Sequence, residues 1–95
     1  ATSSPADTAL WQTLASRTQV VFPGAELAPG MMVGGTDGRF FRDRGSIAYG
    51  AALLAPDLTL DEFSLRFHGN DERIDLESIG LSAQYWYDVA REVVG

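Results

Sequence analysis

The side chain best suited to chemistry is His68, the single histidine of the 95-residue chain. It lies between residues 63–67, which alternate like a short strand, and a helix predicted from Asp75 onward. Functional groups of α/β proteins are commonly placed at such a junction. A neutral imidazole is a good zinc ligand, but one histidine cannot hold the ion alone. The alternative is an ordinary surface or packing histidine.

A second candidate site is the turn that contains Gly35 and Thr36. Glycine lets the backbone approach a ligand closely. Thr36 is predicted to cap a helix whose first amide groups can bind an anion. Arg39, in the first turn, adds a planar cation that suits a carboxylate. The alternative is an ordinary helix start, with Arg39 solvated or paired to Asp37 or Asp43.

Glu72 belongs to a charged run with Asp71 and Arg73, shortly after His68. Asp71 is expected to be a solvated turn residue. Glu72 could instead orient a neighbouring ligand or arginine, as carboxylates do around metal sites. Glu72 is therefore a candidate supporting residue for His68.

Composition limits the classes of partner. The net charge is −6, which argues against nucleic acid because phosphate binding needs a basic face. The chain has no cysteine, so it has neither disulfides nor a thiolate zinc site. No apolar run reaches the roughly 20 residues of a membrane span, so we expect a soluble protein without a membrane partner, with the cytoplasm favoured. The start lacks both methionine and a signal pattern, as expected of a cut or processed chain.

The predicted elements follow the order helix, strand, helix, strand, helix. A helix opens at Ser4, and residues 19–22 and 46–53 read as buried strands. A short helix covers residues 36–44, with Gly45 in the position that usually ends a helix, and a long helix starts at Asp75. This order predicts an α/β layer with parallel strands. Parallel strands normally sit in larger sheets, so the fold is expected to be incomplete on its own. Apolar spacings of three and four predict the core face of the last helix: Leu76, Ile79, Ala83, Trp86, Ala90 and Val93.

Taken together, the motifs resemble the C-terminal part of a known family. The first motif is Gly35-Thr36-Asp37-x-Arg39-Phe40-Phe41-Arg42-x-x-Gly45, the second is His68-Gly69-x-Asp71-Glu72-Arg73-Ile74, and a Tyr49-Gly50 pair lies between them. Each motif alone is weak. In this order, before a long final helix, they are similar to the aminoacylase, carboxypeptidase and succinyl-diaminopimelate desuccinylase family of two-zinc metallopeptidases. The resemblance covers residues 21–95.

The resemblance implies a fold and a role for each motif. Residues 1–95 would be one segment, the C-terminal part of a zinc-exopeptidase-like catalytic domain. His68 matches the family's last zinc ligand, and Thr36 and Arg39 match positions that hold the substrate's carboxylate end. In the family two zinc ions activate a water for amide hydrolysis. The other ligands and the general base lie upstream, so no catalytic residue is expected in this chain.

The expected function is that of a hydrolase segment. With the upstream part of the same domain, it would cleave an amide bond in N-acyl amino acids or small peptides that have a free carboxylate. The isolated chain is expected to be inactive and to bind zinc weakly, and a homodimer is one expected arrangement of the parent. A rival hypothesis is a stand-alone α/β binding or interaction module that holds an acidic ligand at the Thr36 turn. A family member that has lost catalysis and kept the fold is a third.

Overall fold

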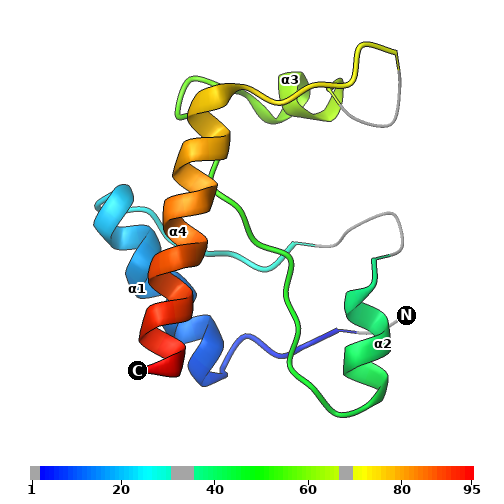
Figure 1. Cartoon of the computed structure of the whole chain (residues 1–95), viewed down its shortest axis with the longest axis vertical. Coiled ribbons are helices and arrows are strands. Elements are labelled where there is room, and N and C mark those ends of the chain that lie inside the picture. The colour runs from blue at the N-terminus through cyan, green and yellow to red at the C-terminus, as the bar shows by residue number, and fades with distance from the viewer. Residues whose placement is uncertain (1–2, 31–35, 67–69) are drawn as a thin grey trace. The chain divides into compact units, whose positions relative to one another are not determined.

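The computed structural model describes residues 3–30, 36–66 and 70–95. These residues form helices that are joined by irregular segments (Figure 1). Their bounds are Ala9–Val21 for α1, Gly38–Asp43 for α2, Leu60–Ser64 for α3 and Leu76–Val94 for α4.

The chain divides into two compact units. The first consists of Ala1–Ala51 together with Val89–Gly95, and the second of Ala52–Asp88. The helices α1 and α2 therefore belong to the first unit and α3 to the second, whereas α4 contributes residues to both.

The predicted α/β fold with parallel strands is wrong for the described ranges, which contain no strand. Residues 19–22, predicted as a strand, instead complete α1, with Phe22 as its C-cap. The Phe22 amide donates to the Thr18 carbonyl at 2.8 Å, and the Thr18 hydroxyl donates to the Leu14 carbonyl at 2.7 Å. A β preference is realised only against a neighbouring strand, so the helical hydrogen bonds prevail here.

The second predicted strand is also wrong, and the strand-like alternation of residues 63–67 gives no strand in its described part. Residues 46–53 adopt neither helix nor strand. Residues 63–66 complete α3 and the turn after it. The N-cap of α3 is Thr59, whose hydroxyl accepts the Glu62 amide at 3.1 Å. Residue 67, the end of the third predicted strand, lies outside the described residues.

The first unit is anchored at the start of α1, where Thr8 is the N-cap instead of the predicted Ser4. The Thr8 hydroxyl accepts the Trp11 amide at 3.1 Å and is hydrogen-bonded to the Tyr49 hydroxyl. Tyr49 also donates to the Pro5 carbonyl. Its ring meets that of Trp11 edge-on, with centroids 5.4 Å apart, a favoured aromatic geometry. The segment around Tyr49 is thereby attached to the beginning of α1.

The second unit is held by serine side chains of α4. Ser82 Oγ accepts the Leu53 amide at 3.1 Å and donates to the Leu53 carbonyl at 2.7 Å. Ser78, which is fully buried, accepts the Ala55 amide at 2.8 Å. Buried backbone groups need a partner, and here hydroxyl groups supply it in place of a neighbouring strand. Leu53, Ala55 and Tyr85 form the buried apolar part of this unit.

The last predicted helix is confirmed as α4, and Asp75 is its N-cap. Its carboxylate accepts the Ser78 amide at 2.8 Å, and its carbonyl accepts the Ile79 amide at 3.2 Å. An aspartate at this position satisfies an amide that has no partner within the helix. The start of the helix is therefore set by local capping chemistry that the sequence shows.

The predicted core face of α4 is wrong. Leu76 is 85% exposed, Ile79 44% and Trp86 43%, whereas Ser78 and Tyr85 are buried. The face turned inward carries serine hydroxyls because the chain packed against it brings unpaired backbone groups. Apolar spacing alone therefore identified the helix but not the face that this unit buries.

Candidate functional site

The helix α2 carries the candidate substrate-binding residues. Asp37, not the predicted Thr36, occupies its N-cap position, and no side chain caps it. The Thr36 carbonyl accepts the Arg39 amide at 3.5 Å, so these two candidates are neighbours in one turn. The Thr36 hydroxyl lies 3.4 Å from where a Cβ on Gly38 would stand. Gly35, the third candidate, lies outside the described residues.

The anion site expected at the amides of this helix is weaker than the sequence suggested. The helix has only six residues, so little dipole accumulates along it. Asp37 also places a carboxylate at its start, which opposes a second anion. Arg39 is therefore the group in this turn that suits a carboxylate.

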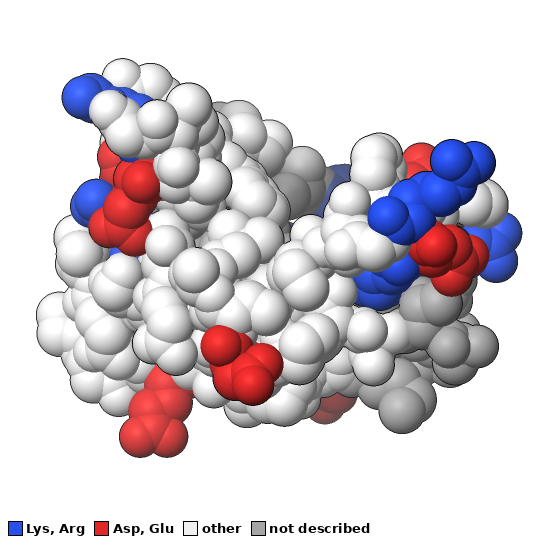
Figure 2. All heavy atoms as spheres, turned by 90° about the horizontal axis from the view of Figure 1, so that it is seen from below, with Lys and Arg blue, Asp and Glu red and all other residues white. Residues whose placement is uncertain are grey.

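Arg39 presents an available positive charge. Its guanidinium carbon lies 4.7 Å from the centre of the Phe40 ring. Among the described residues no carboxylate forms an ion pair with it, and this includes Asp37 and Asp43. A cation–π contact holds the group without neutralising it, and Phe40 is itself 55% exposed. A cation beside an exposed aromatic ring suits a carboxylate that is attached to an apolar group. Figure 2 shows basic side chains gathered around α2 with acidic ones beside them.

Arg42, the second arginine of the motif, holds the unit together. Its Nε and Nη2 donate to the Ala48 carbonyl at 3.0 and 2.7 Å. Ser4 Oγ accepts from Arg42 Nε at 3.3 Å and from the Ala48 amide at 3.0 Å. Sequence reasoning gave Arg42 no role of its own, and no local pattern indicates that Ser4, 38 residues away along the chain, is one of its partners.

The end of α2 agrees with the prediction that Gly45 terminates it. Gly45 has a φ of 90°, which glycine adopts without steric cost. The Gly45 amide donates to the Arg42 carbonyl and the Ser46 amide to the Phe41 carbonyl, both at 3.0 Å. These paired bonds are a Schellman motif, so α2 has a fixed end and a defined position for Arg39.

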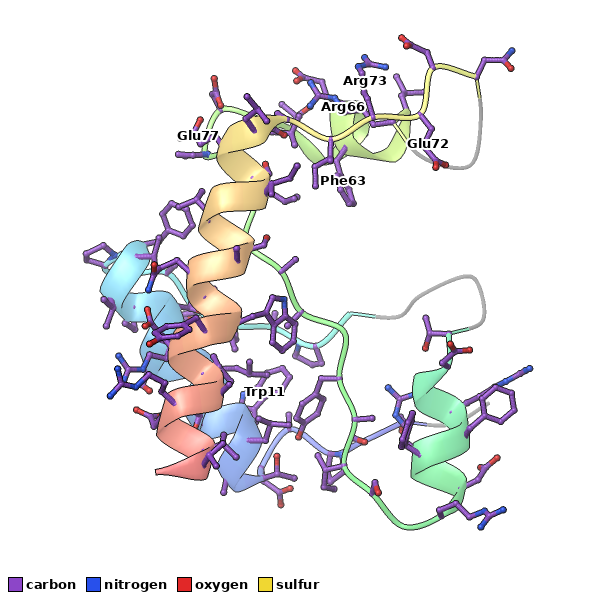
Figure 3. All side chains as sticks on the ribbon, viewed as in Figure 1. Trp11, Phe63, Arg66, Glu72, Arg73 and Glu77 are labelled. Carbon is purple, nitrogen blue, oxygen red and sulfur yellow. The ribbon has the colours of Figure 1, made fainter. Side chains whose placement is uncertain are left out.

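In the second unit, the residues before and after positions 67–69 are joined by a backbone hydrogen bond and by an ion pair. The Arg73 amide donates to the Arg66 carbonyl at 2.8 Å, and Arg66 Nη1 lies 3.3 Å from Asp75 Oδ1. Asp71 has a φ of 60° and pairs with Arg73 at 3.1 Å. Figure 3 shows the side chains of Arg66, Glu72 and Arg73 around the approach to α4.

The Asp75 carboxylate is the titratable group most affected by this arrangement. The hydrogen bond from the Ser78 amide is the largest cause that lowers its pKa, followed by the Ser78 hydroxyl; Arg66 adds a smaller effect. Each favours the charged form of the carboxylate. Sequence reasoning identified Asp75 as a helix start but missed its pairing with Arg66.

The predicted zinc ligand, His68, lies outside the described residues, and Glu72 is exposed. Among the described residues no group of three or more histidine, cysteine, aspartate or glutamate side chains could hold a metal. An imidazole has suitable donor chemistry for zinc, yet a structural or catalytic site needs at least three protein ligands. The described residues therefore do not form a complete zinc site by themselves.

A surface pocket of about 230 Å³ lies in the second unit. Its lining carries four carboxylates and one arginine, so its charge opposes an anionic substrate. The pocket is therefore a poor match for the carboxylate-bearing substrate that the sequence predicts. Its lining residues are Ala55, Asp57, Leu58, Glu62, Arg66, Asp75 and Glu77.

Comparison with known proteins gives one informative similarity. Over 84 residues, the chain is 37% identical to the N-fatty-acyl-amino acid synthase/hydrolase PM20D1 of Xenopus tropicalis. The alignment covers 87% of this chain and 16% of that protein. The chain therefore spans about a sixth of the length of this relative. No family model matches the chain, and no solved structure matches it.

The similarity supports the resemblance drawn from the motifs at its coarser level. The relative is an enzyme whose name states that it makes and hydrolyses N-fatty-acyl amino acids, which agrees with a relation to the aminoacylase and peptidase type of hydrolase. The expected zinc ions and the C-terminal position of the segment remain predictions. Within the described ranges, no helix has the length and apolar character needed to cross a membrane.

Proposed function

We propose that this chain is a segment of a hydrolase that cleaves the amide bond of N-acyl amino acids with a free carboxylate. The observation that carries the proposal is the 37% identity over 84 residues to an N-fatty-acyl-amino acid synthase/hydrolase. The relative's name favours a long acyl group on the substrate. Small peptides with a free carboxylate are the wider class that the motif resemblance adds.

In this proposal Arg39 pairs with the substrate carboxylate. Its guanidinium makes no ion pair among the described residues and rests on the exposed ring of Phe40. A guanidinium can bind a carboxylate through two parallel hydrogen bonds. Thr36, in the same turn, offers a hydroxyl group, and Gly35 would allow the backbone to approach the substrate.

His68 is proposed as one zinc ligand, with Glu72 orienting a neighbouring group. Two zinc ions in the complete site would supply Lewis-acid help and an activated water. The remaining ligands and the general base would come from the upstream part of the same catalytic domain. The 95 residues alone are therefore proposed to hydrolyse nothing.

The test uses the protein as its gene encodes it. Intact mass is measured first, because the proposal requires a mass well above the 10.3 kDa of this chain. The protein is then incubated with an N-palmitoyl amino acid, and release of the free amino acid is measured. The methyl ester of the same compound, which lacks the carboxylate, is the matched control and should be a poor substrate.

The outcomes separate the two main hypotheses. Release of amino acid from the free acid supports the hydrolase. Saturable binding of the free acid without release contradicts catalysis and favours a binding module. A mass of 10.3 kDa for the whole gene product would contradict the segment hypothesis directly.

A further inference from the structure

The part of α4 that belongs to the second unit has apolar side chains that remain exposed. Within residues 76–88, the exposed apolar side chains Leu76, Ile79, Ala83 and Trp86 follow one another at spacings of three and four. At roughly 100° per residue, they lie within about 80° of one another around the helix. We call this set the outer stripe of α4.

The outer stripe is distinct from both other faces of the helix. Ser78 and Tyr85 are buried and lie roughly 120° to one side of the stripe. Glu77 and Gln84 are exposed and polar, and they lie roughly 120° to the other side. A surface helix needs one apolar and one polar face. Because α4 already has a buried face and a polar face, the stripe is an additional face, and it is apolar.

The apolar, uncharged side chains of the stripe favour an apolar protein surface as the partner. The stripe contains no charged residue, and Trp86 supplies the large aromatic group that anchors many interfaces. A net charge of −6 disfavours an anionic membrane surface. A second copy is also disfavoured, because two chains that each carry a net charge of −6 repel one another.

The length of the relative indicates where such a surface would come from. The alignment uses 87% of this chain but only 16% of the relative, so about five sixths of a protein of that kind lies outside these residues. We propose that the outer stripe of α4 is covered by the remainder of the same, longer polypeptide. The inference depends on the proposal that this chain is a segment of a longer hydrolase.

The test is accessibility of single cysteines in the complete gene product. The chain has no cysteine of its own, so Ala83→Cys places a thiol in the stripe and Gln84→Cys places one on the polar face next to it. Alanine to cysteine is a small change that an interface tolerates well, and Ile79→Cys serves as a second stripe position. Modification by a maleimide is followed by peptide mass spectrometry, which separates each thiol from any upstream cysteine.

The expected result is that Ala83→Cys and Ile79→Cys react at least about tenfold more slowly than Gln84→Cys, with equal rates in urea. Equal rates in the native protein would overturn the inference. Protection that appears only as protein concentration rises would indicate a second copy and also overturn it. A gene product of 95 residues would do the same by removing the proposed partner.

The result can be told apart from the test of the proposed function. Native protection without hydrolysis of N-acyl amino acids would retain the inference and reject the activity. Hydrolysis with a freely reactive stripe would retain the activity and reject the inference.

Discussion

Arg66 Nη1 lies 3.3 Å from Asp75 Oδ1, and Asp75 Oδ2 accepts the Ser78 amide at 2.8 Å. One carboxylate therefore pairs with an arginine in the turn after α3 and caps the first turn of α4. The Arg73 amide donates to the Arg66 carbonyl at 2.8 Å. The residues on either side of the segment that includes His68 are therefore hydrogen-bonded to each other. Asp75 therefore connects the turn after α3 to the start of α4.

Replacing Asp75 should lower the melting temperature. Asp75→Ala removes both the cap and the ion pair, so we expect a loss of several degrees. Asp75→Asn keeps an oxygen that can accept the Ser78 amide, so its loss should be smaller. Asp57→Ala, a change at an exposed carboxylate in the same unit, is the control and should have little effect. Thermal unfolding followed by circular dichroism measures all three.

The contribution of Asp75 should also depend on pH. Its pKa is lowered in the folded protein, chiefly by the Ser78 amide. Its stabilisation is therefore fully present above the unfolded value of about 3.9 and is lost as pH falls through the folded pKa. The gap in melting temperature between the parent and Asp75→Asn should be constant near neutrality and shrink in acid. A gap that widened in acid would contradict the assignment.

Ser82→Ala should destabilise the second unit. The hydroxyl of Ser82 serves both the amide and the carbonyl of Leu53, and the variant leaves both without this partner. We expect a loss of about 1–3 kcal/mol in the free energy of unfolding. Ser16→Ala removes an exposed hydroxyl that donates to Thr13, and it should change stability by less than about 0.5 kcal/mol. Urea unfolding of the two variants gives the comparison, and equal losses would argue against the Ser82 contacts.

Two glycines of the α2 motif should respond differently to alanine. Gly45 has a φ of 90° with nothing within 4 Å of an added Cβ, so Gly45→Ala costs backbone strain of about 1 kcal/mol. A Cβ at Gly38 would meet its nearest atoms at 3.4 Å, an ordinary contact, and φ there is not positive. Gly38→Ala should therefore be close to neutral. Urea unfolding distinguishes them, and the reverse order would contradict the Schellman end of α2.

The sequence predicted two helix ends from local signals. The cap at Asp75 and the glycine stop at Gly45 both depend on neighbouring residues, and both are confirmed. Residues 19–22 were wrongly predicted as a strand because an apolar, β-branched run has the same appearance at the end of a helix. Thr18, whose hydroxyl donates to the Leu14 carbonyl, is part of the helix that continues through that run.

The parts that could not be predicted depend on distant partners. Ser82 and Ser78 are hydrogen-bonded to backbone groups of Leu53 and Ala55, which lie more than 20 residues away along the chain. Arg42 likewise acts through Ser4 and Ala48. In the candidate site, the sequence placed Arg39 in the first turn of a helix, but its contact with Phe40 and its lack of an ion pair among the described residues required the structure.

His68 should matter to zinc only in the complete protein. In the isolated 95-residue chain, calorimetry should detect no tight zinc binding, because one imidazole cannot supply a ligand set. In the gene product, His68→Ala should lower zinc content, measured by mass spectrometry of the metal, together with turnover. Asn70→Ala, a change at an exposed residue of the same segment, is the control. Unchanged zinc content in His68→Ala would reject His68 as a ligand.

Arg39 should act on the carboxylate of the substrate. In the gene product, Arg39→Gln removes a charge-assisted contact, so KM for an N-palmitoyl amino acid should rise about 10- to 100-fold. Arg44→Gln removes the same charge from the other end of α2, where the side chain is exposed, and should change KM less than about twofold. The methyl ester, which has no carboxylate to lose, should be affected little by either change. Equal effects of the two variants would mean that the general charge of α2, not a specific contact by Arg39, attracts the substrate.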